Sequence, residues 1–178
     1  MNIVGISGSV RADSNNSRLI ALAGQCCPPQ IQYTVATGLD QLPHFNPDHD
    51  PLDYPAVAAW IDLIRSADGL VISTPDYARG YPGTLKNALD WLVQTDAHID
   101  KPFTMLSATS RSTVGRDTLI VVLETMAGIH IKDASLTTHL LGKSLSLAQL
   151  QQDQALMAEL SQAMTTFYNQ ITSRSGHE

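Results

Sequence analysis

The sequence predicts an α/β protein built on a doubly wound, five-stranded parallel sheet with helices on both faces. Short apolar runs alternate along the 178 residues with segments whose apolar residues recur at three- and four-residue spacing. Such an alternation implies right-handed crossovers and a parallel sheet that is covered on both faces. The loops rich in Ser, Gly and Arg follow the most apolar runs, where a doubly wound sheet binds its ligands.

Five segments are predicted as strands: residues 3–7, 31–37, 69–74, 103–108 and a stretch within 129–138. The first, third and fourth are the most apolar, as strands buried on both faces should be. The second alternates Ile31, Tyr33 and Val35 with polar residues, which is typical of an edge strand. These features favour the strand order 2-1-3-4-5.

Five helices are predicted between these strands, at residues 17–25, 54–67, 83–94, 116–127 and 148–171. The irregular segment 38–53 contains three prolines and is expected to be a loop. We expect one domain over residues 1–172 and a small, polar, flexible tail over 173–178.

Composition narrows the classes of function. The net charge of −6 argues against a general nucleic-acid or anionic-membrane surface. The adjacent Cys26 and Cys27 offer no disulfide framework and no metal-ligand spacing, which suggests a reducing compartment. The six histidines show no paired helical spacing, so no metal site is expected. No leader and no apolar run of about 18 residues is evident, so we expect a cytoplasmic protein without membrane insertion.

Three loops are expected to meet where the strand order reverses: residues 8–16, 75–81 and 109–115. Six of the 11 basic residues lie in or just after these loops: Arg11, Arg18, Arg79, Lys86, Arg111 and Arg116. This placement indicates a local site for an anion. The alternative is that the six residues are ordinary surface charges, because neighbours in sequence need not be neighbours in space.

The first of these loops, residues 8–16, has the composition of a phosphate site. Short hydroxyl and amide side chains surround Arg11 just ahead of a helix: Ser9, Ser14, Asn16 and Ser17. Hydroxyls, free backbone amides and a guanidinium together make charge-assisted bonds to phosphate oxygens. Helix capping is the alternative, because Ser and Asn are preferred N-caps. Arg11 is unnecessary for capping, and we therefore favour a phosphate.

Other phosphate and nucleophile motifs are missing. No Gly-x-x-x-x-Gly-Lys-Ser/Thr occurs, and the glycine after Gly5 and Gly8 is Gly24, too far along for a dinucleotide fingerprint. Ser7 and Ser9 do not lie in a Gly-x-Ser-x-Gly elbow.

The second loop, residues 75–81, joins an apolar strand to an amphipathic helix. Pro82 suits a first helical position, and a helix that begins there leaves several backbone N–H groups free to face a ligand.

Taken together, the two loops resemble those of the NADPH-dependent FMN reductase family of flavodoxin-like proteins, which includes quinone, azo-dye and chromate reductases. The family's phosphate loop, Gly-Ser-x-Arg-x-x-Ser-x-Asn, is matched by Gly8, Ser9, Arg11, Ser14 and Asn16. Its second signature is matched by Pro75, Tyr77, Pro82, Gly83, Leu85, Lys86, Asn87, Ala88, Leu89, Asp90 and Trp91. A weaker match is the segment 42–48.

The chain departs from the family pattern at the tip of the second loop. Asp76 stands for Glu, Ala78 for Asn, Arg79 for a small residue and Gly80 for Ser. The third loop has Thr113-Val114-Gly115-Arg116 where the family commonly has a Gly-Gly pair.

The resemblance implies a set of FMN-binding residues. Those that would hold the phosphate are Ser9, Arg11, Ser14, Asn16 and Ser17. Those that would line the flavin ring are Pro75, Asp76, Tyr77, Ala78, Arg79 and Gly80. The segment from Ser107 to Arg111, with Ser107, Ser110 and Arg111 as its binding residues, would close the pyrimidine side. Tyr77 is as compatible with a subunit contact as with a ring contact. No catalytic side chain is required, because the flavin carries the hydride chemistry.

The function that the resemblance implies is an FMN-dependent NAD(P)H oxidoreductase. Hydride would pass from NAD(P)H to the flavin and on to a small-molecule quinone-like, azo, nitro or metal-oxyanion acceptor, by a ping-pong mechanism. The alternative is a flavodoxin-like FMN-binding electron carrier, or another flavin-binding protein, without NAD(P)H turnover. The family also implies a homodimer or homotetramer. Arg79 is a candidate for contact with the 2′-phosphate of NADPH.

Overall fold

A computed structural model describes residues 1–140 and 145–175, and its centre is a parallel sheet. The strands are β1 (Asn2–Ser7), β2 (Gln32–Val35), β3 (Gly69–Ser73), β4 (Pro102–Ser107), β5 (Ile129–His130) and β6 (Leu136–Thr137). Their order is β2-β1-β3-β4-β5, and β6 pairs with the far end of β4. The predicted fold class and the order 2-1-3-4-5 are confirmed.

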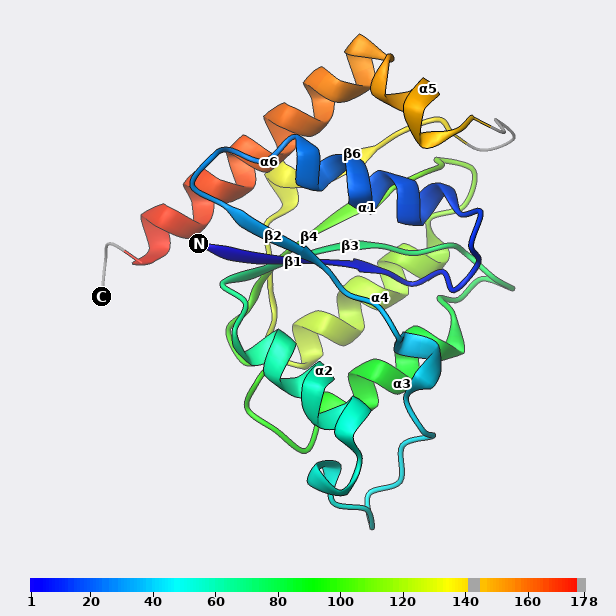
Figure 1. The fold of residues 1–178 in the computed structure, drawn as a ribbon, viewed down its shortest axis with the longest axis vertical. Helices are drawn as coiled ribbons and strands as arrows, with labels where there is room; N and C mark the ends of the chain where they lie inside the picture. The colour runs from blue at the N-terminus through cyan, green and yellow to red at the C-terminus, as the bar shows by residue number, and fades with distance from the viewer. Residues whose placement is uncertain (141–144, 176–178) are drawn as a thin grey trace.

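Helices cover both faces of the sheet (Figure 1). Those on one face are α1 (Asn15–Gln25), α5 (Leu147–Gln151) and α6 (Gln154–Ser175). Those on the other face are α2 (Pro55–Arg65), α3 (Gly83–Leu92) and α4 (Val114–Thr125). Each helical layer packs an apolar core against the sheet, and every residue of β3 is buried between the two cores. β2 is mostly exposed, as an edge strand should be.

Two predicted elements are each divided in the structure. The fifth strand consists of β5 and β6, because a 3₁₀ turn over Lys132–Ala134 separates them. The last helix is interrupted after Gln151, where Asp153 accepts a hydrogen bond from the Leu156 N–H at 3.1 Å and starts a new helix. The apolar residues continue at helical spacing through this point, but the cap formed by Asp153 divides the helix in two. α6 continues to Ser175, into the segment expected to be a tail.

The loop over residues 38–53 is anchored to α3. Asn87 accepts from the Phe45 N–H at 2.8 Å and donates to the Pro43 carbonyl at 2.9 Å. Trp91 donates to the same carbonyl at 2.8 Å and is fully buried. These side chains of the second signature therefore hold the scaffold together. Pro82 is predicted at the first helical position, but α3 begins one residue later, at Gly83, and Pro82 is the extended N-cap residue.

Among the residues described, no helix is long and apolar enough to cross a membrane.

Candidate functional site

A cavity of about 430 Å³ lies at the carboxyl ends of β1, β3 and β4, where the three loops meet as expected. The first loop and the start of α1 contribute Ser9, Arg11, Asp13, Ser14, Asn15, Asn16 and Arg18. The other two loops contribute Thr74, Pro75, Asp76, Tyr77, Ala108, Thr109, Arg111 and Ser112. The volume falls within the range of small-molecule sites. A groove of about 660 Å³ beside α2 is larger, but none of these loops lines it.

The first loop is fixed to the centre of the sheet. The Gly8 N–H donates to the Ser73 carbonyl at 2.8 Å, and the Ser73 hydroxyl donates to the Asn16 side chain at 2.9 Å. Ser14 accepts from the Ser17 N–H at 3.4 Å and so caps α1. Ser14 and Asn16 are buried, so these contacts fix the loop to the interior of the protein.

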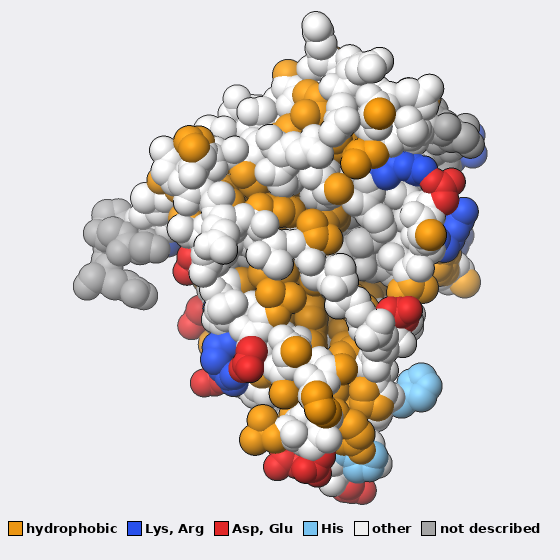
Figure 2. All heavy atoms as spheres, viewed as in Figure 1, with side chains coloured by type: hydrophobic (Ala, Val, Ile, Leu, Met, Phe, Trp, Pro, Cys, Tyr) orange, Lys and Arg blue, Asp and Glu red, His pale blue; other side chains and the backbone are white. Residues whose placement is uncertain are grey.

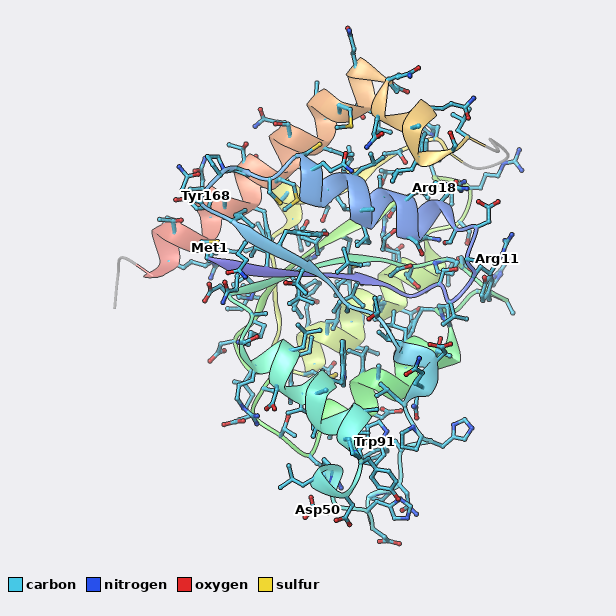
Figure 3. The ribbon with its side chains drawn as sticks, viewed as in Figure 1. Met1, Arg11, Arg18, Asp50, Trp91 and Tyr168 are labelled. Carbon is cyan, nitrogen blue, oxygen red and sulfur yellow. The ribbon has the colours of Figure 1, made fainter. Side chains whose placement is uncertain are left out.

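The cavity is electropositive at its α1 side. Figure 3 shows Arg11 and Arg18 at the same end of the sheet, opposite to Met1 and Tyr168. Arg18 is paired with Asp13 and hydrogen-bonds to Asn15, whereas Arg11 is exposed and forms no ion pair with any described residue. The first turn of α1 carries no acidic residue, and the carboxylate just before its N-cap, Asp13, is paired with Arg18. Figure 2 shows the basic side chains, with acidic neighbours, along this edge.

The second loop ends in a tight turn with a left-handed backbone. Tyr77 and Gly80 exchange backbone hydrogen bonds of 2.8 and 3.0 Å across the turn. Ala78 and Arg79 between them have φ values of 51° and 65°. Residues with a Cβ rarely adopt this conformation, because it brings the Cβ close to the carbonyl oxygen. Tyr77 is 52% exposed and lies at the mouth of the cavity.

The third loop contacts the second through Asp76. The Asp76 carboxylate accepts hydrogen bonds from the Ser112 hydroxyl and from the Gly115 N–H, the latter at 3.1 Å. Bonds from Ser112, Gly115 and the Arg79 main chain lower the pKa of Asp76, since they favour its charged form. Asp76 is therefore a carboxylate at neutral pH.

Eight of the predicted binding residues line the cavity: Ser9, Arg11, Ser14, Asn16, Pro75, Asp76, Tyr77 and Arg111. Six do not, namely Ser17, Ala78, Arg79, Gly80, Ser107 and Ser110. Ser17 points to Ser7, with 2.9 Å between the hydroxyls. The Ser107 carbonyl accepts from Thr138, and Ser110 lies 3.3 Å from His139. Ala78, Arg79 and Gly80 form the turn beyond Tyr77.

Ala108 and Thr109, within the predicted segment 107–111, also line the cavity. Five further lining residues are not predicted from the motifs: Asp13, Asn15, Arg18, Thr74 and Ser112. All lie in the three loops or next to them. The signal for most of them is position within a loop at the carboxyl end of the sheet, since none belongs to a motif.

The residues around the cavity suit anion binding more than acid–base or metal chemistry. None of its lining residues is Cys, His or Lys. Nowhere in residues 1–140 and 145–175 do three or more His, Cys, Asp or Glu gather as a metal site would require. At one side the cavity offers the Arg11 guanidinium and the N-terminus of α1, and the other two loops contribute Pro75, Tyr77 and Arg111.

Known proteins with similar sequences include reductases of quinones and of FMN. The 2-hydroxy-1,4-benzoquinone reductase of a Burkholderia species is 40% identical over 92 residues, which are 51% of this chain and 49% of the relative. The NAD(P)H-dependent FMN reductase of Pseudomonas aeruginosa is 38% identical over 92 residues, with the same shares. The chain is thus matched over about half the length of these curated relatives.

Solved structures share the fold. The flavoenzyme NAD(P)H:(acceptor) oxidoreductase of Paracoccus denitrificans superposes with a TM-score of 0.74 at 20% identity, covering 94% of this chain and 97% of that one. An apo NADH:FMN oxidoreductase gives 0.66 at 24% identity, covering 93% and 87%. The model of the NADPH-dependent FMN reductase family matches residues 1–141. Because this match spans most of the chain and includes all three loops of the cavity, the protein belongs to the NADPH-dependent FMN reductase family.

Proposed function

We propose that this protein is an FMN-dependent NAD(P)H oxidoreductase with a small-molecule acceptor of the quinone-like, azo, nitro or metal-oxyanion class. The observation that carries the proposal is the cavity at the switch point, where Arg11, which pairs with no carboxylate of the described residues, lies beside the N-terminus of α1. When bound, FMN would supply the hydride chemistry, receiving hydride from NAD(P)H and passing it to the acceptor.

The first loop fits a flavin phosphate. Arg11 offers a guanidinium that no carboxylate neutralises among the described residues, and Ser9 offers a hydroxyl. Ser14 uses a lone pair to cap α1, but its hydroxyl proton stays available to a phosphate oxygen. The capping and phosphate interpretations of Ser14 are therefore compatible. A phosphate at this helix end also gains from the dipole of α1.

The second and third loops would hold the flat part of the cofactor. Pro75 and Tyr77 lie on the side of β3, and Thr109 and Arg111 on the side of β4. Of these, Arg111 is positively charged and suits the electron-rich edge of the flavin ring that bears its carbonyl groups. The protein's task is to orient the reactants, and its cavity is small enough that donor and acceptor would have to enter in turn. Ping-pong kinetics are the expected consequence.

Absorption spectroscopy of the purified protein with FMN tests this function. We expect a bound flavin spectrum that NADPH bleaches and that a soluble quinone restores. A flavin spectrum that NADPH leaves unchanged would instead favour the electron carrier. Arg11→Ala should weaken FMN binding by about tenfold or more, because charge-assisted bonds to phosphate are lost. Arg65→Ala is the matched control, since Arg65 pairs with Asp62 and Asp96 far from the cavity.

Arg79 is proposed to bind the 2′-phosphate of NADPH. It lies in the exposed turn just outside the cavity, where a second nucleotide would approach. Arg79→Ala should lower the preference for NADPH over NADH while leaving FMN binding intact. An unchanged ratio of kcat/KM values for the two nucleotides would contradict this role.

We also propose that the protein works in the cytoplasm as a homodimer or homotetramer. The adjacent cysteines are free thiols, which fits a reducing compartment. Cell fractionation tests the location, and light scattering after size exclusion tests the oligomeric state. In such an assembly the exposed Tyr77 could contact the flavin or a second subunit.

A further inference from the structure

Asp76 forms the contact between the second and third loops, both of which line the cavity. Its carboxylate accepts from the Ser112 hydroxyl and from the Gly115 N–H, the second bond measuring 3.1 Å. Ser112 and Gly115 lie 36 and 39 positions further along the chain. Both bonds are to the same oxygen, Oδ2, so this oxygen is occupied by donors of the third loop.

The Asp76 carboxylate also caps the N-terminus of α4. The residue at the N-cap of this helix, Thr113, makes no side-chain capping bond to it. Asp76 satisfies the N–H of Gly115 in the first turn instead, and places a negative charge at the positive end of the helix. A cap that comes from a different loop fixes that loop relative to the helix, which a cap from Thr113 would not do.

Gly115 permits this close approach. A Cβ at Gly115 would lie 2.9 Å from the carbonyl carbon and oxygen of Gly80 and 3.2 Å from the Tyr81 nitrogen. The backbones of the two loops are therefore in direct contact on the α4 side. Asp76, whose side chain is one methylene shorter than the glutamate of the family motif, reaches the Gly115 N–H at 3.1 Å.

The same carboxylate favours the left-handed turn. A hydrogen bond from the Arg79 main chain is one of those that stabilise the charged form of Asp76. Ala78 and Arg79 have φ values of 51° and 65°, a conformation that residues with a Cβ adopt at a cost. A turn of this kind persists where surrounding contacts hold it in place.

We propose that Asp76 is a positioning residue, and that its bonds to Ser112 and Gly115, here called the Asp76 clasp, set the width of the cavity for the flavin ring. The clasp joins the 75–80 loop to residues 112–115, so that Pro75 and Tyr77 are held at a fixed distance from Thr109 and Arg111. Asp76 acts through these residues and needs no contact with the flavin. This inference rests on the proposed function.

Amide hydrogen exchange in the flavin-free protein tests the clasp directly. Asp76→Ala removes the acceptor, and Ser112→Ala removes one donor while keeping the carboxylate. We expect the Gly115 amide to exchange at least about tenfold faster in Asp76→Ala than in the parent protein, because its hydrogen bond is lost. Ser112→Ala should give a smaller increase, and Ser112→Thr, which keeps the hydroxyl, should restore the parent rate.

FMN titration tests the consequence for the cavity. The Kd for FMN should rise about tenfold in Asp76→Ala and less in Ser112→Ala. The matched control is Asp117→Ala, which removes another carboxylate from the first turn of α4. Asp117 is bonded to Arg116 and Thr113 and makes no bond to the 75–80 loop, so the FMN Kd should stay at the parent value.

Two results would overturn the proposal: an unchanged Gly115 exchange rate in Asp76→Ala, or an FMN Kd within twofold of the parent in both clasp variants. An equal loss of FMN affinity in Asp117→Ala would also overturn it, since general weakening of α4 would then be the cause. If the parent protein binds no FMN, the proposed function fails, and with it the effect of the clasp on the flavin; the exchange rates still decide whether the clasp exists.

Discussion

The two sides of the cavity are held in place by different means. The first loop is bonded to the interior: Asn16 is buried and accepts from Ser73, in the central strand of the sheet. The opposite side is held by a loop-to-loop contact at the surface, through Asp76, Ser112 and Gly115. Substitutions on the α1 side should therefore affect both the fold and ligand binding, whereas those in the clasp should affect binding with little change in the fold.

Asn16→Ala should have the largest effect of the substitutions compared here. It leaves the buried Ser73 hydroxyl without its acceptor at the centre of the molecule. We expect the free energy of unfolding of the flavin-free protein to fall by about 2 kcal/mol, and FMN affinity to fall as well. Urea denaturation measures the first and a flavin titration the second.

The matched control for Asn16→Ala is Asn169→Ala, which alters an exposed position of α6. That variant should stay within about 0.5 kcal/mol of the parent protein. Equal stability of the two variants would mean that the Asn16–Ser73 hydrogen bond does not anchor the first loop, and the contrast between the two sides of the cavity would disappear.

Gly115→Ala is the corresponding test on the clasp side. A methyl group 2.9 Å from two backbone atoms of Gly80 forces the loops apart, and main chain cannot yield as a flexible side chain can. We expect FMN affinity to fall by about tenfold or more, with a loss of unfolding free energy of about 1 kcal/mol. The measurements are the same titration and urea denaturation.

Gly83→Ala is the control for the added methyl group. Gly83 begins α3, and a Cβ there would meet nothing within 4 Å. Its FMN affinity should equal that of the parent protein. A loss of stability in Gly115→Ala as large as that in Asn16→Ala would show that the clasp belongs to the folding core.

The difference between the two sides also explains what the sequence could predict. The strand order follows from which runs are most apolar, and Arg11 and Ser14 are identified by their position before a helix. The role of Ser112 is not visible in the sequence, because its partner lies 36 residues away and no local pattern pairs them. The need for Gly115 depends on the approach of Gly80 from another loop. The division of the last helix at Asp153 is not visible in the sequence, because the apolar period continues across it.

The smallest expected effect comes from Ala78→Gly, which separates the strain of the turn from the contacts that hold it. Glycine adopts a φ of 51° without the Cβ penalty, but it also increases the entropy of the unfolded chain. We expect a net gain of about 0.5 kcal/mol in unfolding free energy. Ala127→Gly, at a φ of 62° just after α4, should give a similar gain at a position outside the cavity.

FMN affinity then decides what the left-handed turn contributes. If the Asp76 clasp fixes the second loop, relieving strain at Ala78 should leave the FMN Kd within about twofold of the parent value, as in Ala127→Gly. A large loss of affinity in Ala78→Gly alone would mean that the stiffness of the turn itself shapes the cavity. In that case the second loop would be positioned by its own backbone conformation, and Asp76 would hold a loop that is already rigid.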